Sequence, residues 1–172
     1  MKLYRLTFSF IFVLTLLACN ASAETAKADL RGTALRPALR GQALFEQQEG
    51  GMKVTVELEN AIPGRLAFHI HENGSCADNG KAAGGHFNPA GTPHGNVVTD
   101  GVEKAHPGDF GNLEIGENGS GKKEFLVKEL SLSEGKYAIL GKSMIIHAKE
   151  DTFEQPTGNA GERIACGIIE KA

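Results

Sequence analysis

The clearest pattern in the chain is the alternation of apolar and polar residues over KVTVELE, residues 53–59. Val54, Val56 and Leu58 would face one side and the polar residues between them the other, which is typical of a half-buried strand. Turn signals such as EGG, IPG and ENGSG separate further short candidates. These predicted strands are ALFEQ (43–47), RLAFHIH (65–71), KEFLVKEL (123–130), KYAIL (136–140) and SMIIHA (143–148).

Many short strands with close turns predict an all-β domain, an antiparallel barrel or sandwich. The 22 glycines and the absence of tryptophan agree with a turn-rich chain, and no sustained helical period follows residue 18. Two stretches rich in glycine and proline interrupt the strands, residues 72–112 and 148–163. Loops of this length in a compact domain are usually functional or fixed by something else.

The first residues have the pattern of an export signal. Lys2 and Arg5 precede the apolar run LTFSFIFVLTLLA, which ends at the motif LLAC. This favours a bacterial lipoprotein signal over residues 1–18, a lipidated Cys19 that begins a tether over residues 19–28, and a single domain over residues 29–172. An ordinary signal peptide or an uncleaved anchor is the alternative, and each of these also places the domain outside the cytoplasm.

Export affects how the other two cysteines are interpreted. Disulfides form and persist in oxidising compartments, so we expect Cys76 and Cys166 to pair, with two separate buried thiols as the alternative. The formal net charge is −3, and no basic run stands out that could neutralise phosphates. A nucleic-acid partner is therefore not expected.

The histidines suggest a metal centre. On a strand, His69 and His71 would share one face while Phe68 and Ile70 face the core. The other four histidines are His86, His94, His106 and His147. His106 lies three residues before Asp109, and His147 lies at the end of an apolar strand. Imidazoles suit copper and zinc, and three imidazoles with one carboxylate suit a tetrahedral zinc site. Six unrelated structural histidines would be the alternative.

Five blocks, in order along the chain, carry a family resemblance: FHIHENGSC, GGHFNPAGTPHG, HPGDFGNL, IIHAKED and TGNAGERIACGII. With them the chain resembles the copper/zinc superoxide dismutases, as a bacterial, lipoprotein-type member. The resemblance implies an eight-stranded antiparallel Greek-key barrel of the immunoglobulin-like sandwich class, with two long loops that form a channel to copper. Residues 72–112 would carry the zinc ligands, and residues 148–163 would form the electrostatic loop.

The resemblance also implies a role for each matching residue. Asp151 would link a copper ligand to a zinc ligand, Cys76 and Cys166 would form the family's disulfide, and Arg163 would receive the anionic substrate beside copper. His86 would bridge the two metals and supply a proton. The implied copper ligands are His69, His71, His86 and His147, and the implied zinc ligands are His86, His94, His106 and Asp109.

The implied activity is dismutation of superoxide to dioxygen and hydrogen peroxide, with one copper per chain alternating between Cu(II) and Cu(I) and one structural zinc. The expected partners are superoxide as substrate, a membrane through lipidated Cys19 and, left open, a second copy of the chain in a homodimer. The protein would face the periplasm or lie on the cell surface. The alternatives are an exported protein that stores or delivers copper without turnover, and a structural lipoprotein that binds zinc only.

Overall fold

The computed structural model describes residues 24–172, and the predicted signal segment and Cys19 lie outside the described residues. Within residues 24–172, no helix is long and apolar enough to cross a membrane. The elements in chain order are β1 (Thr25–Gly32), β2 (Arg40–Gln48), β3 (Gly51–Glu59), β4 (Gly64–His71), η1 (Lys81–Ala83), α1 (Val97–Asp100), β5 (Asp109–Ile115), β6 (Gly121–Val127), β7 (Ser143–His147), β8 (Arg163–Ile168) and β9 (Glu170–Lys171).

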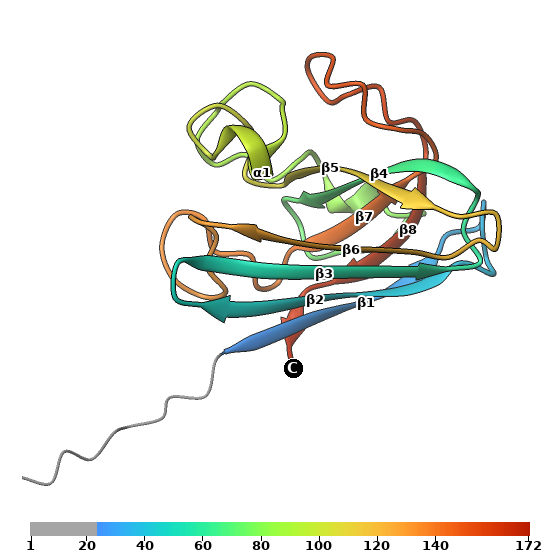
Figure 1. The fold of residues 1–172 in the computed structure, drawn as a ribbon, viewed down its shortest axis with the longest axis horizontal. Helices are drawn as coiled ribbons and strands as arrows, with labels where there is room; N and C mark the ends of the chain where they lie inside the picture. The colour runs from blue at the N-terminus through green and yellow to red at the C-terminus, as the bar shows by residue number, and fades with distance from the viewer. Residues whose placement is uncertain (1–23) are drawn as a thin grey trace, which may run out of the picture.

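Eight of the strands form one antiparallel sheet in the order β5-β4-β7-β8-β1-β2-β3-β6, and the two-residue β9 pairs with β1. The sheet curls into a nearly closed barrel, and the two long loops lie on one side of it, beyond β4 and β5 (Figure 1). The connections from β3 to β4 and from β6 to β7 join strands that are not neighbours, as in a Greek key. The predicted all-β, eight-stranded barrel is therefore confirmed.

Alternating apolar residues fill the barrel. On β3, Val54, Val56 and Leu58 are buried while Glu57 and Glu59 are exposed, as the sequence pattern predicts. The rings of Phe68, Phe110 and Phe125 pack together with centroids 5.0–5.9 Å apart. Burying a side chain of this size contributes roughly 1.5–3 kcal/mol. The core thus fixes β4 and β5, the strands from which several of the predicted metal ligands project.

The first strand begins before residue 29, the predicted start of the domain. Strand β1 begins at Thr25, so residues 25–28 belong to the barrel rather than to the tether. Ala26 and Ala28 are fully buried, in alternation with exposed neighbours. Their methyl groups give only a weak apolar signal in the sequence, which is why the strand was missed.

The strand predicted over residues 136–140 is also wrong. The segment forms a single isolated bridge, between Ser131 and Ala138, and its backbone otherwise bends in turns. Ile139 is nevertheless fully buried and packs in the core. The apolar residues of this segment close one end of the barrel, so their pattern reflects burial without a strand. The predicted loop over residues 72–112 ends earlier than expected, because β5 begins at Asp109.

Lys123 joins the two strands at the ends of the sheet order. Its Nζ atom on β6 donates to the carbonyl oxygens of Phe110, at 3.3 Å, and of Asn112, at 2.9 Å, on β5. The ammonium also lies 5.3 Å and 5.5 Å from the ring centroids of Phe68 and Phe125. Burial lowers the pKa of this lysine. One half-buried side chain thus bridges β5 and β6, which are not neighbours in the sheet order.

Replacing Lys123 with methionine should lower the free energy of unfolding by about 2 kcal/mol, because two carbonyls lose their charged donor and two rings lose a cation. Urea unfolding of the two proteins measures the difference. Lys122→Met is the matched control, since Lys122 is exposed and pairs with Glu57 on the surface; it should change stability little. Equal effects of the two substitutions would contradict the bridging role.

Candidate metal centre

All six histidines are buried and meet at one side of the barrel. His69 and His71 come from β4, where they share the face opposite Phe68 and Ile70, as strand alternation predicts. His147 ends the neighbouring strand β7. His86 is tied to His71 by an isolated antiparallel bridge. The remaining histidines, His94 and His106, lie in the same long loop as His86. The structure thus brings together imidazoles from two strands and one loop.

The first group consists of four histidines, each offering one ring nitrogen within 4.8 Å of the others. Its members are His69, His71, His86 and His147. The Nε2 atoms of His71 and His147 face each other at 3.4 Å. Their Nδ1 atoms are engaged by the carbonyl oxygens of Gly84, at 3.0 Å, and Gly161, at 3.1 Å. Backbone carbonyls therefore fix both rings so that their Nε2 atoms point into the group, as in metal sites where an outer partner orients the imidazole.

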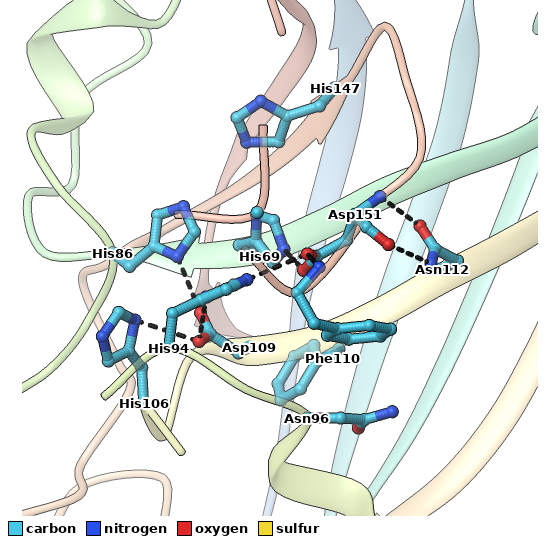
Figure 2. Close-up of polar contacts among 12 residues, drawn as sticks. His69, His86, His94, Asn96, His106, Asp109, Phe110, Asn112, His147 and Asp151 are labelled. Atoms are coloured by element: carbon cyan, nitrogen blue, oxygen red, sulfur yellow. Dashed lines mark hydrogen bonds and ion pairs between the residues drawn. The ribbon is translucent and has the colours of Figure 1, made fainter. Parts of the chain in front are cut away.

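The second group, which shares His86, converges on one carboxylate (Figure 2). Oδ1 of Asp109 lies 2.7 Å from His86 Nδ1, and Oδ2 lies 2.5 Å from His94 Nδ1 and 3.0 Å from His106 Nδ1. Asp109 is placed at the start of β5, directly before the buried Phe110. Three imidazoles and one carboxylate are the ligand set typical of zinc.

Asp151 connects the two groups. Its Oδ2 lies 2.9 Å from His69 Nε2 and its Oδ1 lies 2.9 Å from His94 Nε2 (Figure 2). The side chain of Asn112 holds the backbone of Asp151 at both polar atoms, accepting from its N–H at 2.7 Å and donating to its carbonyl at 3.0 Å. Sequence reasoning missed Asn112, since a single asparagine on a strand gives no signal of a partner 39 residues away.

Three of the buried ring nitrogens have no hydrogen-bond partner, which fits a role in binding metals. The Nδ1 atoms of His69, His94 and His106 are buried without a hydrogen-bond partner. The Nδ1 atoms of His94 and His106 do lie near Asp109, but as a cluster of close polar atoms rather than aligned hydrogen bonds. Buried polar atoms of this kind are costly unless something satisfies them. Four imidazoles suit copper in the first group, and the second group suits zinc.

Burial and hydrogen bonds shift the pKa values of these residues in opposite directions. Burial lowers the pKa of His71 to about 3 and that of His86 to about 4. Burial would also lower the pKa of His94, but the close carboxylates of Asp109 and Asp151 outweigh it and raise the value to about 9. Burial would raise the pKa of Asp109, but the three imidazoles close to its carboxylate hold the value well below its usual range.

The metal-free protein should be most stable near pH 6.5. Between about pH 3 and 6.5, the unfolded chain binds more protons than folded His71 and His86 do, so stability falls as the pH falls. Each of these two histidines lowers the free energy of unfolding by up to about 1.4 kcal/mol for each unit that the pH falls. His94 has the opposite sign, because the stability it contributes below pH 6.5 is lost as the pH rises toward about 9. Urea unfolding after removal of metals, at a series of pH values, measures this curve; a flat one would contradict it.

A pocket of about 390 Å³ opens beside the first group. Arg163 lies in its wall, and its guanidinium donates to the carbonyl oxygens of Gly80 and Gly84, both at 2.6 Å. Among the described residues, two cationic side chains and no carboxylate line this pocket, the second cation being Lys149. The neighbouring acid Glu150 instead pairs with Arg65 at 2.8 Å. The pocket wall is thus positively charged although the chain as a whole is acidic.

A disulfide joins Cys76 to Cys166, as predicted. It ties the start of the long loop to β8, three residues after Arg163. The loop segment that follows Cys76 supplies the carbonyls of Gly80 and Gly84, which hold Arg163. The disulfide therefore anchors the backbone that orients this guanidinium.

Comparison with known proteins gives consistent matches. Residues 39–169 match the family model described as copper/zinc superoxide dismutase. The chain is 32% identical to the Cu-Zn superoxide dismutase of Paramecium bursaria Chlorella virus 1, over 93% of this chain and 88% of that protein. It is 33% identical to the extracellular Cu-Zn superoxide dismutase of Brugia pahangi, over 76% and 69%. A crystal structure of the clock protein EA4 superposes with a TM-score of 0.78 at 31% identity, covering 88% of this chain and 97% of that one.

Proposed function

This chain belongs to the copper/zinc superoxide dismutase family, and we infer that it dismutates superoxide outside the cytoplasm. The net reaction converts two superoxide ions and two protons into dioxygen and hydrogen peroxide. The observation that carries the function is the pair of four-residue groups that share His86. In this proposal the first group holds copper and the second holds zinc. The copper residues are His69, His71, His86 and His147, and the zinc residues are His86, His94, His106 and Asp109.

Bound copper supplies one-electron redox chemistry between Cu(II) and Cu(I), while zinc supplies a fixed charge without redox chemistry. The protein's own part begins with Arg163, whose guanidinium attracts the superoxide anion into the pocket. With zinc held at Nδ1, beside Asp109, the imidazole of His86 would carry its proton at Nε2. Transfer of that proton to the departing peroxide is the general-acid step assigned to His86.

Arg163→Ala should lower kcat/KM for superoxide about tenfold or more and flatten its dependence on ionic strength, since a positioned cation is lost from the pocket. Pulse radiolysis at several salt concentrations measures both effects. Glu162→Ala, next to Arg163 and exposed, is the control and should retain the dismutation rate. An Arg163 variant with unchanged rate and salt dependence would contradict the role of this guanidinium.

Export and membrane attachment form the second part of the proposal. It is supported by the signal pattern before Cys19, by the Cys76–Cys166 disulfide, which favours an oxidising compartment, and by a relative named as extracellular. We propose a lipoprotein anchored through Cys19, facing the periplasm or the cell surface. Cys19→Ser should move the protein from the detergent phase to the aqueous phase in a detergent partition of whole cells. Unchanged partition would overturn the anchor. The homodimer stays a prediction, which sedimentation equilibrium tests.

A further inference from the structure

The loop over residues 148–162 contacts His94 through three alternate residues. The carboxylate of Asp151 lies on the imidazole, with Oδ1 2.9 Å from Nε2 (Figure 2). The ring of Phe153 stacks on the same imidazole, with centroids 6.4 Å apart and planes 24° apart. The side-chain amide of Gln155 bonds the backbone of His94 at both polar atoms, accepting from its N–H at 3.0 Å and donating to its carbonyl at 2.8 Å. We call these contacts the His94 clasp.

The loop takes an unusual backbone path to make these contacts. Phe153 has φ +60°, in the left-handed region that bulky residues seldom adopt. In this conformation its N–H donates to Asp151 Oδ1 at 2.8 Å while its ring faces His94. Gly158 closes the loop with φ +76°, where a Cβ atom would collide with Asp151 Oδ1 and His94 Nε2. The loop therefore closes directly onto the imidazole of His94.

His94 depends on this loop more than on its own segment for its position. Both of its backbone polar groups bond to a side chain 61 residues away, where a strand would use a neighbouring backbone. Other residues of the second group have local supports: Asp109 lies in β5, and His86 is bridged to His71 on β4. Among these three residues, His94 is the one held by loop side chains.

We propose that Phe153 and Gln155 are positioning residues for His94, and that the His94 clasp must open before zinc leaves. The proposal rests on the assignment of the second group to zinc. The same loop places Lys149, Thr157 and Asn159 in the wall of the substrate pocket. Opening of the clasp therefore links loss of zinc to a change in the pocket, and an intact clasp keeps both in place.

The test measures the release of zinc and copper from the loaded protein to a chromogenic chelator. Gln155→Leu removes both bonds to His94 at similar side-chain size, and zinc release should become about tenfold faster while copper release is unchanged. Gln47→Leu is the matched control. Its amide likewise donates to a carbonyl, of Gly51, and accepts from a backbone N–H, of Leu132, at the end of β2. This control should release zinc at the parent rate.

A second variant tests the stacked ring. Phe153→Asn keeps a residue that tolerates the left-handed backbone and removes the aromatic contact, so zinc release should become several-fold faster. If both loop variants bind zinc and release it at the parent rate, the role of the clasp is overturned and the zinc assignment stands. Equal acceleration of copper and zinc release would also overturn it, because that result means general loosening. A parent protein that takes up no zinc would overturn the zinc assignment and the clasp together.

Discussion

Replacing His147 with alanine should reduce superoxide dismutation at least about 100-fold and leave zinc bound. Loss of an outer partner of a metal ligand typically costs 10- to 100-fold, and a ligand should cost more. His147 is buried, its Nε2 lies 3.4 Å from that of His71, and the carbonyl of Gly161 holds its Nδ1. It belongs to the first group and is absent from the second. Copper content, zinc content and turnover should be measured on one sample.

His106→Ala is the matched control, because His106 belongs to the second group and is absent from the first. It should lose zinc and retain copper, the reverse of the His147 variant. Turnover of His147→Ala within tenfold of the parent rate, with copper bound, would mean that the first group is not the copper site. Loss of both metals in both variants would contradict the division into two groups.

Removing the disulfide should lower the free energy of unfolding by about 4 to 5 kcal/mol. The bond between Cys76 and Cys166 closes a loop with a sequence separation of 90, and in the chain-entropy model a longer loop restricts the unfolded chain more. The double variant Cys76→Ser, Cys166→Ala suits the positions, since Cys166 is buried and Cys76 is partly exposed. Urea unfolding of metal-free protein measures the change.

The disulfide variant should also lose activity, because the bond anchors the segment whose carbonyls hold Arg163. Reduction of the parent protein provides the control, since it opens the same loop without a substitution. A loss of stability below about 1 kcal/mol in both the variant and the reduced protein would contradict the loop-closure account.

The candidate ligands could be found in the sequence because their patterns are local. Strand alternation places His69 and His71 on one face, and the structure shows them buried there, opposite Phe68 and Ile70. The remaining candidate ligands followed from motif blocks whose order matches the family. The fold class was predictable for a similar reason, since alternating stretches such as β3 carry their burial pattern within a few residues.

The residues that the sequence missed act through distant contacts. Asn112 bonds Asp151, Gln155 bonds His94 and Lys123 bonds the carbonyls of β5, and none of the three stands in a pattern that names its partner. The sequence also did not show which charged side chains line the pocket. Glu150 follows Lys149 in sequence, yet it pairs with Arg65 on β4 while Lys149 lines the pocket. Tertiary packing decides such contacts, and a single sequence does not reveal it.

In the proposed function, a copper site and a zinc site share His86, and the protein that holds both metals dismutates superoxide. Metal content and superoxide dismutation of the purified protein, measured on one sample after loading with copper and zinc, test it most directly. We expect one copper and one zinc per chain and fast turnover that is lost in His147→Ala. Stoichiometric copper without turnover in the parent protein would contradict the dismutase function and favour a copper-storage or delivery protein.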